Sequence, residues 1–219
     1  MHRNRLALPI FPLASVVLFP RVQTPLHVFE PRYRQMTEHA LAGDRRIAMA
    51  VVRPDRAHEM AGDPPVFPIA CAGVIRDSRR LPDGRFDIVL SGSDRVRILE
   101  EPGRPRDQLY RTATVTPLED DSGPDCAERL AALRPRVIHL VREVFGGDGA
   151  EMSSQPFAGI DDAAFVNALC NALPVSTPEK QGLLEADGVL ARCERLIAVL
   201  EFLLAEHTPH RVPNSGTFH

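Results

Sequence analysis

Apolar residues change their spacing once along this 219-residue chain, and this change constrains the fold more than any other feature. Up to about Leu118, apolar and polar side chains tend to alternate, as they do along half-buried strands, with one helix early on. Past Ser122, apolar residues recur every three to four positions, which is the period of a helix with one apolar face. The sequence therefore predicts an α+β fold, with a β-rich subdomain over residues 1–120 and a helical subdomain over residues 121–219.

Prolines divide the first part into short apolar runs. The runs at residues 6–10, 16–19 and 26–29 are each bounded by proline. Because proline lacks the N–H that a strand donates to its neighbour, we predict that all three are edge or barrel-rim strands. Further strands are expected at residues 47–52, 67–75, 86–90, 96–98 and 110–116. Many short strands without repeated helices predict an antiparallel-rich, barrel-like sheet.

Local signals mark one helix and two turns among these strands. Pro31 can begin the helix, because its fixed φ suits a first turn, and Gly43 can end it. The sequence Pro82-Asp83-Gly84 predicts a tight hairpin turn before Phe86. A second turn is expected at residues 92–94.

The second part predicts four helices. The first covers residues 126–144, where Pro135 should cause a kink, and it should end at Gly146-Gly147. Asp161 or Asp162 can cap the next helix. We expect a mobile loop near residues 146–159.

Two further helices follow. Ser176 and Glu179 have the spacing of a capping box and begin a short helix that ends near Glu185. Asp187 can start the last helix, and the tail from His207 should be loose.

Bulk properties exclude some classes of protein. The net charge of −3 gives no general field for attracting nucleic acid. The amino terminus does not read as a signal peptide, and no apolar run reaches 18 residues, so we expect a soluble cytoplasmic protein. Four scattered cysteines, without a CxxC pair, predict buried and reduced thiols. They are Cys71, Cys126, Cys170 and Cys193.

Several segments, in both parts of the chain, resemble the amino-terminal substrate-binding domain of Lon proteases. They are LPIFPL and VVLFP near the start, VFEPRYRQM at the first helix, LPDGRFDIVLSGSDRVRILE in the hairpin, and LPVSTPEKQGLLEADGVLARCERLIAVL near the end. Together they cover nearly the whole chain in the family's order. The resemblance implies a PUA-like pseudo-barrel followed by a helical subdomain, and a role in contacting protein substrates or partners.

Full-length Lon proteases also use a Walker-type ATPase and a Ser-Lys dyad. The sequence has no GxxxxGK[ST] loop. Its single lysine, Lys180, is expected to be a solvated helix residue beside the capping box. We therefore expect a stand-alone, non-enzymatic module with no catalytic, cofactor or metal site.

Other polar residues also favour structural readings. Ser91 is expected in a turn, without the context of a nucleophile elbow. Adjacent carboxylates are expected to cap helices or to be solvated; they are Glu100-Glu101, Asp120-Asp121 and Asp161-Asp162. Isolated histidines are expected in structural or surface roles, and Pro209 interrupts any helical pair in the tail. They are His27, His39, His58, His139, His207 and His210.

The leading hypothesis is a module that binds unfolded polypeptides or a protein partner, such as an ATP-dependent protease. Binding could use β-edge pairing, or apolar contact in a cleft between the sheet and the helices. Arg32 and Tyr33 either shape a peptide groove or, as we favour, pair locally and pack the barrel. The residues that bind peptide are not identified by the sequence.

Two alternatives come from other functional classes. An RNA-binding role would use the basic residues of the hairpin, which are Arg76, Arg79, Arg80 and Arg85. An unrecognised hydrolase is disfavoured by the missing dyad.

Overall fold

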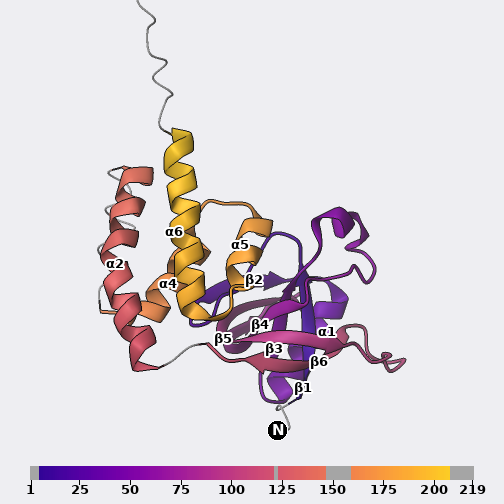
Figure 1. The fold of residues 1–219 in the computed structure, drawn as a ribbon. Coiled ribbons are helices and arrows are strands. Elements are labelled where there is room, and N and C mark those ends of the chain that lie inside the picture. The colour runs from indigo at the N-terminus through magenta and orange to yellow at the C-terminus, as the bar shows by residue number, and fades with distance from the viewer. Residues whose placement is uncertain (1–4, 121–122, 147–158, 208–219) are drawn as a thin grey trace, which may run out of the picture.

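The fold is α+β, as predicted, with a mixed six-stranded sheet and a carboxyl-terminal helical part (Figure 1). The computed structural model describes residues 5–120, 123–146 and 159–207. The loop predicted near residues 146–159 and the tail from His207 therefore lie almost wholly outside the described residues. The first part contains β1 (Leu6–Leu13), β2 (Gln23–Val28), α1 (Pro31–Ala42), β3 (Arg46–Val51), the 3₁₀ helix η1 (Pro54–Glu59), β4 (Ile69–Arg80), β5 (Phe86–Glu100) and β6 (Arg111–Leu118).

Strand β5 closes the sheet into a barrel. The strand order is β2-β5-β4-β3-β1-β6, and β5 also pairs with β6. The first half of β5 pairs with β2, where Phe86 lies opposite Val28, and its second half pairs with β6, where Arg95 lies opposite Leu118. All neighbours are antiparallel except β1 and β3, which are parallel.

Small side chains fill the closed part of the barrel. Five strands make a narrow interior, which leaves little room for large residues. The buried cluster that these five strands share consists of Leu8, Ile10, Ala48, Ala50, Ala70, Ala72, Val96, Ala113 and Val115. Larger apolar residues of the same strands face outward, where α1 and the helical part cover them.

Two predictions about the proline-bounded runs were wrong. Strand β1 is not an edge strand, because it pairs with both β3 and β6. Residues 6–10 of β1 pair with β6 and residues 10–13 pair with β3. Pro9 is therefore paired only with β6, and Pro12 only with β3. Residues 16–19 form no strand, although three of them are buried in the core. The run at residues 26–29 does include part of an edge strand, β2.

The second predicted turn was also wrong, because β5 runs without interruption through Gly92. A Cβ atom on Gly92 would lie 2.1 Å from the backbone oxygen of Phe19. The glycine therefore marks a close approach of two backbone segments within a strand and not a turn. The turn at Pro82-Asp83-Gly84 does form, with Gly84 at a φ of 82°.

The helical part follows its predicted stop and start signals. Helix α2 (Pro124–Phe145) contains Pro135 and ends at Gly146, Asp161 caps α4 (Asp162–Ala172), and Ser176 and Glu179 form a capping box on α5 (Thr177–Leu184). Helix α6 (Gly188–His207) runs beside α2, and α5 lies between α6 and the strands (Figure 1). No helix in the described ranges is both long and apolar enough to cross a membrane.

Buried charges connect the barrel to the helices. Asp120 accepts a hydrogen bond from Arg95 Nε of β5 at 2.9 Å, and it lies 3.3 Å from Arg192 Nη2 of α6. Both arginine side chains are almost fully buried, with 2% and 0% of their surface exposed. Arg95 also donates to the carbonyls of Leu184 and Ala186. Asp120, which was expected to be a cap or a solvated residue, therefore neutralises two buried cations.

The four cysteines are buried and unpaired with one another. Removal from water disfavours the thiolate, so burial raises the pKa of Cys170 to about 12 and that of Cys193 to about 11. Burial also raises the pKa of Cys71. The three thiols with a raised pKa are therefore neutral at ordinary pH, and the predicted burial of all four cysteines is confirmed.

We expect Asp120→Asn to destabilise the protein by about 2 kcal/mol, because it leaves two buried arginines without their anion. Urea unfolding followed by circular dichroism measures this change. Glu194→Gln is the matched control, because Glu194 pairs with Arg129 on an exposed surface, and we expect it to cost about 0.5 kcal/mol or less. Equal losses in the two variants would show that Asp120 does not join the two parts.

We expect raised pH to destabilise the fold through the buried thiols. Their pKa is higher in the folded protein than the ordinary 9.0, so their stabilising contribution is complete below pH 9 and is lost as pH rises toward 11. Between pH 8 and 10 each thiol should cost about 1 kcal/mol. Urea titrations of the wild type and of Cys193→Ala isolate this effect, since the variant should lose less over the same interval. An identical loss of stability in the wild type and in Cys193→Ala would show that the Cys193 thiol does not cause it.

Candidate functional site

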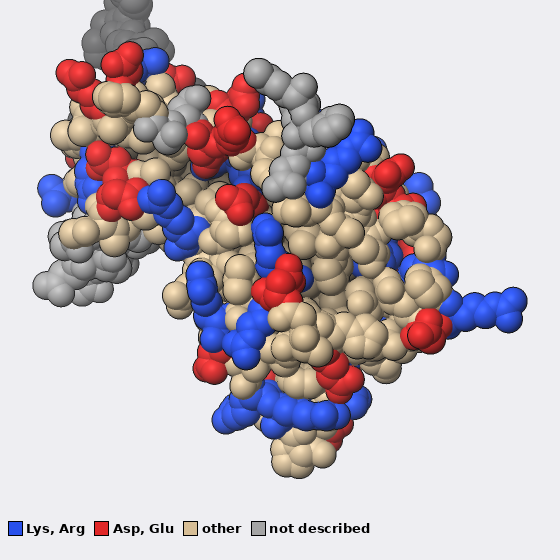
Figure 2. Space-filling view, turned by 90° about the horizontal axis from the view of Figure 1, so that it is seen from below, with Lys and Arg blue, Asp and Glu red and all other residues tan. Residues whose placement is uncertain are grey.

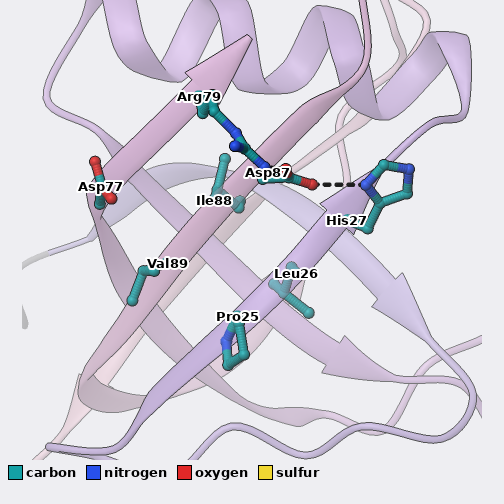
Figure 3. Close-up of a pocket in the computed structure, with 8 residues that line it drawn as sticks. All are labelled: Pro25, Leu26, His27, Asp77, Arg79, Asp87, Ile88 and Val89. Carbon is teal, nitrogen blue, oxygen red and sulfur yellow. Dashed lines mark hydrogen bonds and ion pairs between the residues drawn. The ribbon is translucent and has the colours of Figure 1, made fainter. Parts of the chain in front are cut away.

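An open groove lies on the solvent-exposed face of β2, β5 and β4, opposite the face that packs against the main core. Its cavity volume is about 530 Å³. The lining residues, drawn in Figure 3, are Pro25, Leu26, His27, Asp77, Arg79, Asp87, Ile88 and Val89. The groove thus combines an apolar area with charged groups at its sides.

The register of the three strands builds the groove in two rows. Val89 of β5 lies opposite both Pro25 of β2 and Asp77 of β4. Two residues earlier on β5, Asp87 lies opposite both His27 of β2 and Arg79 of β4. Because side chains alternate along a strand, these residues share the exposed face, while Phe86, Ile88 and Leu90 point to the opposite face and pack in the main core.

Charged groups of the second row are paired with one another. Asp87 accepts from Arg79 Nη2 at 2.6 Å and lies 2.7 Å from His27 Nδ1. The hydrogen bonds from Arg79 and then from His27 hold the pKa of Asp87 below its usual value. His27 Nε2 lies 3.2 Å from Arg85 Nη1, so the imidazole ring connects Asp87 on one side to Arg85 on the other.

The free edge of β2 borders the groove. The N–H of Gly92 donates to the carbonyl of Val22 at 2.9 Å. This bond shows which residues of β2 direct their backbone groups toward β5 and which direct them away. By alternation, the backbone groups of Gln23, Pro25 and His27 point away from β5. Pro25 has no N–H to offer there, so pairing of another strand along this edge is interrupted at its centre.

Arg32 and Tyr33 adopt the local roles that the sequence favoured. The Tyr33 ring is buried against Phe11, with ring centroids 4.6 Å apart, and burial raises the pKa of Tyr33 to about 12. Arg32 donates to Glu30 at 2.9 Å and to the carbonyls of Met60 and Gly62. Both side chains are engaged within the protein, and neither lines the groove.

The region between the barrel and the helices is packed. Gln181 of α5 donates to the carbonyl of Ile69 of β4, and Arg95 reaches the end of α5. One buried apolar cluster continues from the strands into the helices. These contacts pack α5 and the other helices against the strands at this boundary.

The remaining polar residues are held locally. Ser91 lies within β5 and not in a turn. Lys180 is partly buried, not solvated as expected, and its Nζ donates to the carbonyl of Asn171 at 2.6 Å. Partial burial lowers its pKa. The described residues contain no group of three or more His, Cys, Asp or Glu side chains suited to hold a metal ion.

The isolated histidines occupy separate places. His39 lies 3.0 Å from the Tyr110 hydroxyl, His58 lies beside Glu59, and His139 is on the surface of α2. The side chains of His207 and His210 lie outside the described residues. Among the histidines that the structure describes, His27 is the one that lines the groove.

Carboxylates accompany three of the four basic residues of the hairpin. Arg79 pairs with Asp87, Arg80 with Glu38, and Arg85 with Asp83. Basic and acidic side chains are also interspersed over the face shown in Figure 2. This arrangement gives the RNA-binding alternative no specific support.

Comparisons with known proteins agree on one family. A family model described as the ATP-dependent protease La (LON) substrate-binding domain matches residues 7–201. Lon protease 2 of Herpetosiphon aurantiacus is 28% identical over 205 residues, covering 89% of this chain and 24% of that protein. Lon protease of Escherichia coli is 25% identical over 204 residues, covering 90% and 25%. The chain thus spans about a quarter of the length of these curated relatives.

Solved structures share the fold. A Lon N-terminal domain protein from Xanthomonas campestris matches with a TM-score of 0.59 and 24% identity, covering 88% of this chain and 98% of the other. The N-terminal domain of a Mycobacterium avium complex Lon protease matches with a TM-score of 0.65 and 16% identity, covering 93% and 100%.

Proposed function

Since the chain belongs to the family of the Lon substrate-binding domain, we propose that it binds exposed apolar segments of other polypeptides in the groove between β2 and β4. The matched family is a non-catalytic part of Lon proteases. We propose that the contribution of this chain is likewise binding, without a chemical step of its own.

The observation that carries this proposal is the apolar area of the groove. The Pro25 ring is exposed and Val89 is partly exposed on neighbouring strands. Phe29, just beyond β2, is 59% exposed. Its ring stacks on the ring of His27, with the two ring centroids 6.2 Å apart. Exposed apolar side chains of this kind on a rigid sheet can serve as a binding surface.

The groove suits recognition that tolerates many sequences. It is open, so it can accept side chains of different shape, and its apolar contacts have no directional requirement. Edge groups of Gln23 and His27 can add backbone hydrogen bonds that are independent of sequence. Full strand addition is disfavoured by Pro25, so the face of the sheet should supply most of the affinity.

We further propose that binding occurs in the cytoplasm, where the buried thiols stay reduced, and that it serves an ATP-dependent protease or the direct capture of unfolded chains. Affinity purification from native cytosol distinguishes these roles. Recovery of a protease supports an adaptor, and recovery of many unfolded clients supports direct capture.

We expect Val89→Gln to weaken binding of an apolar peptide about fivefold, because it removes part of the apolar floor without adding charge. Fluorescence anisotropy with a labelled peptide that contains two aromatic residues measures the dissociation constant. Circular dichroism and urea unfolding confirm that the variant is folded.

Leu99→Gln is the matched control for this variant. Leu99 is also on β5, is 43% exposed and does not line the groove. We expect its substitution to leave the dissociation constant unchanged. Equal binding by both variants and the wild type would exclude the groove as the binding site.

A further inference from the structure

Building on the proposed function, we propose that the groove selects apolar segments that carry a basic side chain next to the apolar one, and that Asp77 makes this selection. Asp77 faces the groove from β4, directly opposite Val89. Pro25, Val89 and Asp77 thus form one row across three strands, with two apolar residues followed by a carboxylate.

Asp77 differs from the other charged groups of the groove because its charge is not neutralised by an ion pair. Its side chain is exposed, and Oδ1 accepts only from the backbone N–H of Ser78 at 2.8 Å. No Arg, Lys or His side chain in the described part of the chain lies within ion-pair distance of it.

The neighbouring basic groups are occupied elsewhere. Arg79, two residues along β4, extends toward Asp87 and pairs with it at 2.6 Å (Figure 3). Arg85 pairs with Asp83 at 2.6 Å. Arg79 and Asp87 therefore balance each other's charge in the second row, whereas Asp77 acts on Arg79 only at longer range and keeps a carboxylate beside the apolar floor.

The distances suit a peptide that lies across the face of the sheet. Residues opposite each other on neighbouring strands have Cβ atoms about 5 Å apart. An apolar side chain resting on Pro25 and Val89 therefore places the next side chains of the same peptide within reach of the Asp77 carboxylate. A lysine or arginine there gains an ion pair, and an acidic residue meets repulsion.

The test uses three labelled peptides that are identical except at one position beside a phenylalanine. That position is Lys in the first peptide, Gln in the second and Glu in the third. Fluorescence anisotropy with the full chain at low ionic strength gives the three dissociation constants. We expect the Lys peptide to bind about two- to fivefold more tightly than the Gln peptide, and the Glu peptide to bind more weakly than both. Added salt should reduce these differences.

Two variants assign the preference to one carboxylate. Asp77→Asn keeps the oxygen that accepts from Ser78 but removes the charge, so it should bind all three peptides with the affinity of the Gln peptide. Asp55→Asn makes the same change in net charge on η1, outside the groove, and should keep the wild-type preference.

The possible results separate this inference from the function on which it rests. Equal binding of the three peptides by the wild type overturns the selection for basic residues and leaves the groove as an apolar site. A preference that persists in Asp77→Asn overturns the role of Asp77. Absence of binding by every peptide overturns the proposed function itself.

Discussion

The close approach of the Phe19 carbonyl to Gly92 is the constraint on which the rest of the structure depends. No side chain fits between these two backbone segments, since an added Cβ atom would lie 2.1 Å from the oxygen. On one side of this point β5 pairs with β2 and carries the groove, and on the other it pairs with β6 and closes the barrel. The contact therefore places the groove and the closure of the barrel on a single strand.

Charge, in addition to apolar packing, joins the two parts of the molecule. Burial of Arg95 and Arg192 would be unfavourable without an anion, and Asp120, at the end of the sheet, supplies it. Because these groups form bonds only when the barrel and the helices are correctly placed, they favour one arrangement over other apolar contacts. The groove lies on a different face of the sheet and does not use these residues.

Local signals in the sequence were sufficient for the helices and the hairpin. Pro31 and Gly43 delimit α1, Ser176 and Glu179 cap α5, and each of these signals acts within a few residues of the element it ends. The errors concerned features that depend on distant segments. The two-sided pairing of β1 and the strand role of Gly92 are set by partners far along the chain.

The groove could not be identified from the sequence for the same reason. Pro25, Asp77 and Val89 come from three separate strands, and only the register of those strands brings them into one row. The alternation of Asp87 and Val89 with buried neighbours did indicate which side of β5 faces outward. It gave no information about which residues of β2 and β4 would lie beside them.

Pro25 also limits strand pairing along the free edge of β2. An exposed edge strand is a template on which identical edges can stack, and a protein that handles unfolded chains would be exposed to such growth at every encounter. A missing N–H in the middle of β2 breaks the regular series of donors that stacking requires. The same residue lines the groove, so under the proposed function one proline would both contact an apolar side chain and discourage aggregation.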